Sequence, residues 1–147
     1  MSAAGLLTIG FTQKSAEEFF TLLAESDVTI LADVRLNTKG QLSGFAKARD
    51  IEYFLGFFGI KYEYWSDFAP TKEMRKNYHA ERNFENYAHN YKELIESRNS
   101  VEILDSQKLH SERICLMCSE PTCEKCHRLV AAMQIITKYP ELDVEHI

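Results

Sequence analysis

The stretch Thr29-Ile30-Leu31-Ala32-Asp33-Val34-Arg35 decides the fold of this chain. Its apolar residues follow one another without alternation, and charged residues appear only toward its carboxyl end. A strand has this pattern when helices cover both of its faces, as in a parallel sheet. We therefore predict that residues 29–35 form a central parallel strand, with Asp33 and Arg35 on one face near its carboxyl end.

Four other segments predict further strands, because each is short, largely apolar and bounded by turn or capping residues. They are residues 6–11, 60–65, 113–119 and 143–147. Helical patterns lie between them. Residues 15–18 form a capping box, apolar residues recur at helical spacing from 51 to 58, and residues 122–138 predict a helix with an apolar inward face.

The alternation of strands and helices predicts an α/β fold. We expect a small three-layer structure with a mainly parallel sheet of about five strands, right-handed crossovers and helices on both faces. A tyrosine-rich helical insertion at about residues 71–110 interrupts the alternation. The length of 147 residues is typical of one domain, so we expect a single α/β domain over residues 1–147.

Composition narrows the class of protein. Hydrophobic residues make up 45% of the chain and charged residues 27%, which is typical of a globular protein. The formal net charge of −5 argues against long nucleic acid as a partner. The sequence lacks a long apolar run and a signal-peptide pattern, so we expect a cytoplasmic protein with no membrane partner. The oligomeric state stays open.

Four cysteines lie between Cys115 and Cys126 in the pattern C-x2-C-x4-C-x2-C. This crowding is unlike a disulfide framework, so we expect thiols. Structural zinc sites usually separate their two cysteine pairs by a dozen or more residues. Cys115 and Cys118 also leave opposite faces of the predicted strand. We therefore expect no disulfide, zinc or iron–sulfur cluster joining Cys115 with Cys118, a buried Cys115, and no metal or cofactor in the site.

The carboxyl ends of the strands predict the site, because ligands of parallel α/β sheets bind beyond that edge. Cys118 ends a predicted strand, and Cys126 lies in the first turn of the predicted helix after it, where unpaired N–H groups stabilise anions and thiolates. The candidate catalytic residues are Cys118, Glu120, Cys126 and His127, and the candidate ligand-binding residues are Gly10, Asp33, Arg35, Arg128 and His146.

Each of these residues also has a structural interpretation. Asp33 would cap the following loop while Arg35 is merely solvated. Cys126 would pack under the sheet while Arg128 pairs with Glu120 or Asp33. The aromatic residues of the insertion and of the strand before it would close over a planar ligand or belong to the core: Tyr64, Trp65, Tyr78, Tyr87 and Tyr91.

Five ordered blocks of the sequence resemble a family of bacterial and archaeal proteins grouped as domain of unknown function 488. The blocks are Thr8-Ile9-Gly10, Asp33-Val34-Arg35, Cys118-Ser119-Glu120, Cys126-His127-Arg128 and His146-Ile147. The resemblance covers nearly the whole chain and implies a small α/β fold with a polar pocket built from these blocks. Many relatives have a histidine where this chain has Phe11, so the resemblance leaves the substrate open.

Two functions follow from these patterns as hypotheses. In the first, the domain binds or processes a small anionic ligand, including nucleotide- and nucleic-acid-derived molecules. Arg35 and Arg128 would then bind the anion, Glu120 would orient it or act as a base, and Cys118 or Cys126 would be a nucleophile or a polar wall. In the second, the same groups form a satisfied polar network in a non-catalytic metabolite-binding or structural module.

Overall fold

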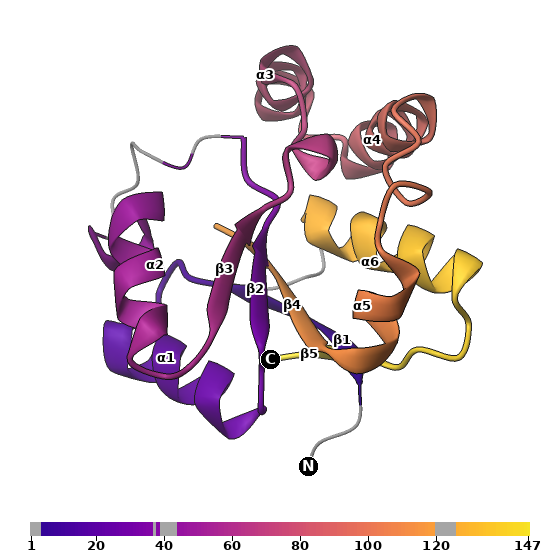
Figure 1. Cartoon of the computed structure of the whole chain (residues 1–147). Helices are drawn as coiled ribbons and strands as arrows, with labels where there is room; N and C mark the ends of the chain where they lie inside the picture. Colours follow the sequence, from indigo (N-terminus) through magenta and orange to yellow (C-terminus); the bar gives the residue numbers. More distant parts are fainter. Residues whose placement is uncertain (1–3, 37, 39–43, 120–125) are drawn as a thin grey trace.

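A computed structural model describes residues 4–36, 38, 44–119 and 126–147. Within these residues five strands form one parallel sheet in the order β3-β2-β4-β1-β5 (Figure 1). The strands are β1 (Gly5–Gly10), β2 (Ile30–Asp33), β3 (Lys61–Tyr64), β4 (Arg113–Cys118) and β5 (Val144–His146). The predicted α/β class and parallel sheet are confirmed, and the residue 29–35 segment supplies an interior strand.

Helices cover both faces of the sheet. On one face α1 (Ala16–Glu25) and α2 (Ala48–Gly56) pack on Leu31 and Met117. On the other face α4 (Phe84–Ser97), α5 (Ser106–Ser111) and α6 (His127–Lys138) pack on Ala32 and Leu116. Figure 1 shows these two groups of helices on opposite sides of the strands. Neighbouring residues of one strand therefore belong to different layers, as strand alternation requires.

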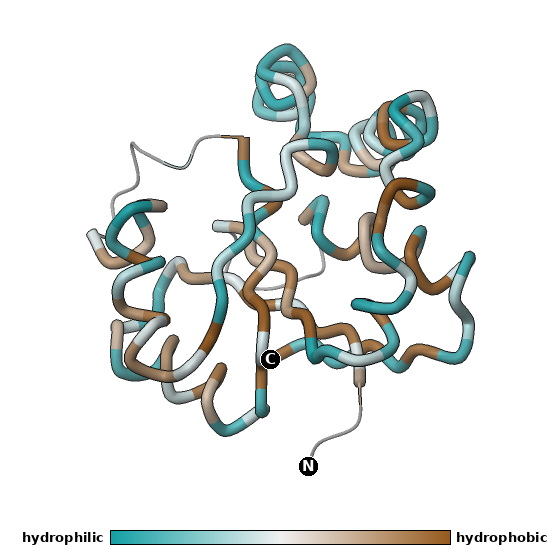
Figure 2. The backbone as a smooth tube through the Cα atoms, viewed as in Figure 1, coloured by the Kyte–Doolittle hydropathy of each residue, from teal (hydrophilic) through white to brown (hydrophobic). Residues whose placement is uncertain are grey.

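The predicted insertion at residues 71–110 is helical, comprising α3 (Lys72–Glu81), α4 and α5. Thr71 caps α3 by accepting a hydrogen bond from the Met74 N–H at 3.1 Å. No residue of α3 is buried, and Figure 2 shows this helix as mostly hydrophilic, unlike the apolar strands at the centre of the molecule. Helix α3 packs on α4 and lies beside the carboxyl edge of the sheet rather than in the core.

The start of the last helix differs from the prediction. Helix α6 begins at His127, and Cys126 is its N-cap residue, with extended backbone at φ −134° and ψ 142°. Cys126 therefore precedes the first turn instead of lying in it. Residues 122–125 of the predicted helix lie outside the described residues. The described part of the chain also contains two short 3-10 helices, η1 (Gly44–Ala46) and η2 (Ser66–Phe68). No helix among the described residues is long and apolar enough to cross a bilayer.

Candidate functional site

Strand register brings the ends of β1, β2 and β4 to one edge. Gly10 lies beside Cys118, and Asp33 lies beside Met117. Beyond the strands, the Phe11 N–H donates to the carbonyl of Cys118 at 3.4 Å, and the Val34 N–H donates to the carbonyl of Met117 at 3.2 Å. The backbone thus fixes where the side chains after each strand emerge.

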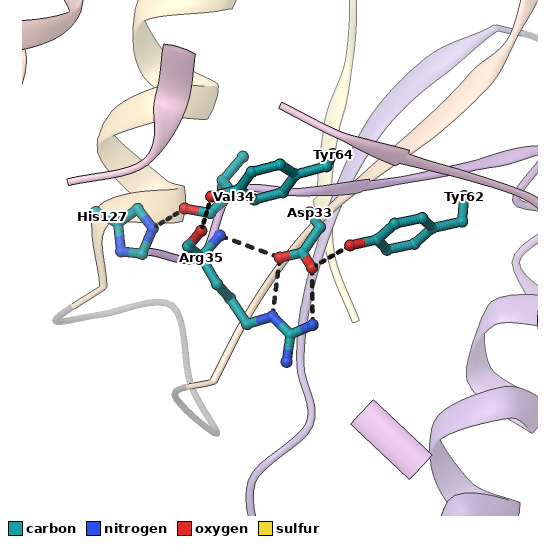
Figure 3. Close-up of polar contacts among 6 residues, drawn as sticks. All are labelled: Asp33, Val34, Arg35, Tyr62, Tyr64 and His127. Carbon is teal, nitrogen blue, oxygen red and sulfur yellow. Dashed lines mark hydrogen bonds and ion pairs between the residues drawn. The ribbon is translucent and has the colours of Figure 1, made fainter. Parts of the chain in front are cut away.

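Asp33 and Arg35 form a buried ion pair at this edge. Nε and Nη2 of Arg35 donate to the two carboxylate oxygens of Asp33 at 2.8 Å and 2.7 Å, a bidentate arrangement (Figure 3). Asp33 is 0% exposed and Arg35 is 1% exposed. The Arg35 N–H also donates to Asp33 at 3.1 Å, so Asp33 does cap its loop. The interpretation of Arg35 as a solvated residue is wrong, because its guanidinium is folded back onto Asp33.

The third nitrogen of this guanidinium points away from Asp33 in Figure 3. Nη1 of Arg35 is buried and has no hydrogen-bond partner among the described residues. The Phe11 ring lies against the same group, with its centroid 5.2 Å from Cζ of Arg35. A ring face attracts a cation but accepts no strong hydrogen bond. One donor of a buried cation is therefore left for another acceptor.

Two tyrosines of β3 support the ion pair. The Tyr62 hydroxyl donates to Oδ2 of Asp33 at 2.7 Å, and the Tyr64 hydroxyl donates to the carbonyl of Arg35 at 2.9 Å (Figure 3). Burial, followed by the bond to Asp33, raises the pKa of Tyr62, so this residue remains a neutral donor. Tyr62 was not among the predicted site residues. Its alternation with Tyr64 along the predicted strand at residues 60–65 is a local signal, but the neighbour of that strand is known only from the structure.

Cys118 and Cys126 lie on the α4–α6 face of the sheet and belong to its core. The structure pairs their sulfur atoms as a disulfide, with Cα atoms 7.7 Å apart. The expectation of thiols is therefore wrong for these two residues. The end of a strand and the cap of the helix after it meet at one edge, which brings residues eight positions apart together. Cys115 is free, fully buried and on the opposite face, as strand parity predicted.

Arg128 reaches this sulfur pair from the first turn of α6. It is 1% exposed, and its Nη1 donates to Sγ of Cys118 at 3.1 Å. Burial lowers the pKa of Lys14, in the loop after β1, and the charge of Arg128 lowers it further. The same two causes lower the pKa of His146, which is hydrogen-bonded through Nδ1 to the Thr8 hydroxyl. The charge of Arg128 is thus felt at the end of β5 and in the loop after β1, while its guanidinium contacts Cys118 at the end of β4.

His127 is a buried, neutral imidazole. Its Nε2 lies 2.8 Å from the carbonyl of Val34 and must carry the proton of that hydrogen bond (Figure 3). Nδ1 is therefore the lone-pair nitrogen, and it faces Sγ of Cys126 at 3.9 Å. Burial lowers the pKa of His127 to about 4; the bond to Val34 opposes this, and the charges of Arg75 and Arg128 add to it.

This pKa predicts a pH-dependent loss of stability. Below about pH 6.5 the unfolded chain protonates this histidine, whereas the folded chain stays neutral until about pH 4. Stability should therefore fall as the pH falls through this window, by about 3 kcal/mol for the shift given. Urea denaturation at a series of pH values measures this loss of stability in the wild type and in His127→Gln. The Cys118–Cys126 pair is kept in the same oxidation state in both proteins. Gln keeps a donor for Val34 but does not titrate, so equal pH profiles would contradict the prediction.

A small cavity opens beside the sulfur pair. It lies between the start of α6 and helix α3, and its lining residues are Arg75, Tyr78, His79, Tyr87, Ser119, Cys126 and His127. Tyr78 and Tyr87, two of the aromatic residues for which either a ligand contact or a core position was expected, are among them. Tyr91 is instead fully buried in the core, where its hydroxyl donates to the carbonyl of Phe68 at 2.7 Å.

The predicted site residues fall into two contact groups. Asp33 and Arg35 form one, on the side of the sheet that carries Leu31. The other comprises Cys118, Cys126, His127 and Arg128, with His146 nearby. The bond from His127 to the carbonyl of Val34 connects them. A single pocket that contains both groups stays a prediction. Glu120 and Cys123 lie outside the described residues.

Sequence reasoning missed Lys14 and Arg75. Lys14 follows β1 by four positions, so the rule that selected Gly10 also pointed to its loop. Arg75 reaches the cavity only because α3 packs beside the carboxyl edge, and no local pattern indicates that contact. Among the described residues no group of three His, Cys, Asp or Glu side chains could hold a metal ion.

The fold and this edge define an α/β protein with buried cationic groups beyond its parallel strands. Residues 15–135 match the family described as Domain of unknown function DUF488. Because the match spans most of the chain, the protein belongs to this family, as its motifs indicated. Gly10 and His146 lie outside the matched residues. No curated protein and no solved structure matches the chain.

Proposed function

We propose that this protein binds a small anionic ligand at the carboxyl edge of its sheet, and that phosphate esters such as nucleotides are the ligand class. The observation that carries the proposal is Nη1 of Arg35, which is buried without a hydrogen-bond partner among the described residues. A buried donor left without an acceptor costs about 1–3 kcal/mol, more for a charged group. A phosphate oxygen would satisfy it with a charge-assisted hydrogen bond.

The charges around this edge support the same ligand class. Arg35, Arg128 and Lys14 all lie at or just beyond the ends of the strands, and Arg75 lines the adjacent cavity. Asp33 is the one fully buried carboxylate among the described residues, and Arg35 already occupies both of its oxygens. An anion would therefore meet excess positive charge in a place where burial weakens screening by solvent.

The second candidate function is a structural one, in which these groups only fix the fold. It is favoured by the saturation of the Asp33 carboxylate, which accepts hydrogen bonds from Arg35 and from Tyr62. Such a network rigidifies a core without any ligand. The two functions differ in whether an added anion stabilises the folded protein, because a ligand that binds only the folded state raises its stability.

Calorimetric titration of the wild-type protein tests the proposal. Inorganic phosphate and AMP should both bind, adenosine should not, and the affinity for AMP should fall as the salt concentration rises. Phosphate and AMP should also raise the thermal unfolding midpoint of the protein, and adenosine should leave it unchanged. Absence of heat and of any midpoint shift with both anions would contradict anion binding and leave the structural function.

A further inference from the structure

We propose that Cys118 and Cys126 form a reversible dithiol–disulfide pair that exchanges with small thiols through the adjacent cavity, and that this cavity favours thiols carrying a negative charge. Exchange at these two sulfur atoms does not require anion binding at Arg35, and it is measured by sulfur chemistry rather than by anion affinity.

The arrangement of the cysteines selects this pair. The sulfurs of Cys118 and Cys126 lie in contact, although one ends a strand and the other caps a helix. Cys115 is separated from them by the sheet itself. Burial raises the pKa of the Cys115 thiol, which keeps it protonated and unreactive. Among the described cysteines, exchange is therefore confined to one pair.

Arg128 makes Cys118 a good leaving group. Its Nη1 lies 3.1 Å from Sγ of Cys118, in a position where both side chains are almost fully buried. A guanidinium so close to sulfur stabilises the thiolate. In thiol–disulfide exchange a stabilised thiolate leaves faster. The disulfide should therefore open with the negative charge on Cys118 rather than on Cys126.

Cys126 is only 2% exposed, but it is the sulfur on the side of the cavity, from which a small thiol would approach. It lines the cavity together with Ser119 and Arg75, whereas Cys118 does not. The lone pair of Nδ1 of His127 faces Cys126 at 3.9 Å, and the bond from Nε2 to Val34 holds the ring in this orientation. In the reduced state this nitrogen can accept a hydrogen bond from the Cys126 thiol. The cavity is thus lined by the sulfur of Cys126, whereas the sulfur of Cys118 lies farther from it.

The exchange balances without any bound cofactor. A small thiolate attacks Sγ of Cys126, the bond between Cys126 and Cys118 breaks, and Cys118 leaves as a thiolate beside Arg128. A second small thiolate attacks the sulfur of the first in the mixed disulfide and releases Cys126. Two small thiols are oxidised to one small disulfide, the protein gains two thiols, and the protons lost by the small thiols end on the two cysteines.

The lining of the cavity sets the preferred charge of the thiol. Arg75 contributes to this cavity from α3, and its charge is one of the causes that lower the pKa of His127, so its field reaches the sulfur pair. An anionic thiol such as mercaptoacetate would be attracted, and a cationic thiol such as cysteamine would be repelled.

The pair itself is tested by oxidising the protein with 2-hydroxyethyl disulfide, alkylating the remaining thiols and digesting with trypsin. Cleavage after Lys125 separates the peptide that contains Cys118 from the peptide that contains Cys126. We expect a disulfide between residues 114–125 and 126–128, assigned to Cys118 by fragmentation. The Cys123→Ser variant should retain it, and Cys118→Ser should lose it. A linkage that persists in Cys118→Ser, or four alkylated thiols under oxidising conditions, would overturn the proposal.

The charge preference is tested by the rate of reduction. The rate at which mercaptoacetate or cysteamine reduces the protein disulfide is divided by the rate at which the same thiol reduces 2-hydroxyethyl disulfide. This ratio corrects for the intrinsic nucleophilicity of each thiol. At low salt this ratio should favour mercaptoacetate by about tenfold. Arg75→Gln should reduce the preference, with Arg128 accounting for what remains, while Lys61→Gln, which removes an exposed cation at the amino end of β3, should leave it at the wild-type value. Equal ratios in the wild type, or a preference for cysteamine, would refute the assigned ligand class.

Discussion

Asp33→Ala should destabilise the protein by about 3–5 kcal/mol, because it leaves the guanidinium of Arg35 buried without its carboxylate. Asp33 is 0% exposed and accepts both bidentate hydrogen bonds from Arg35, which is itself 1% exposed. The Tyr62 hydroxyl loses its partner in the same substitution. Total stabilities of natural domains are about 5–15 kcal/mol, so the change should be large in urea denaturation.

Two further variants separate the ion pair from general damage at this position. Asp33→Ala combined with Arg35→Met removes both charges and should recover a good part of the loss, since the buried charge is no longer unpaired. Asp33→Asn keeps one acceptor for Arg35, so its stability should lie between that of the wild type and that of Asp33→Ala. This variant still provides a measurement if Asp33→Ala does not fold. A double variant that is no more stable than Asp33→Ala would show that the cost does not come from the unpaired guanidinium.

The strands could be predicted from sequence because a parallel sheet covered on both faces leaves a simple local pattern. Leu31 and Ala32 are consecutive and both fully buried, yet they belong to different layers. The same alternation correctly placed Cys115 and Cys118 on opposite faces. The capping box at Ser15 also depends on residues three positions apart, and both of its hydrogen bonds are present.

The contacts within the site could be predicted only in part, because they depend on the order of strands and the packing of helices. Local sequence does not say that β3 lies beside β2, so the bond from Tyr62 to Asp33 was not foreseen. Strand order and the position of the α6 cap together bring Cys126 to Cys118. The placement of Arg75 depends on how α3 packs, which no residue pattern of that polar helix indicates.

Strand alternation also divides the site in a way that was not foreseen. Arg35 lies against Phe11, which packs with α1 and α2, whereas Arg128 contacts Cys118 in the core beneath α4 and α6. Two arginines at the same edge therefore approach it from opposite layers. A ligand that contacted both arginines would therefore have to lie across the strand ends.

Arg35→Lys should weaken phosphate and AMP binding by about 10–100-fold, which corresponds to the roughly 1.5–3 kcal/mol of a hydrogen bond to a charged group. A lysine ammonium can keep the ion pair with Asp33, but it has no second nitrogen to present where Nη1 of Arg35 points away from that carboxylate (Figure 3). The matched control is Arg113→Lys, the same substitution at the amino end of β4, which should leave affinity unchanged. Urea denaturation of each variant, run beside the calorimetry, separates lost binding from lost folding. A folded Arg35→Lys protein that binds AMP as tightly as the wild type would mean that Nη1 is not the anion's donor.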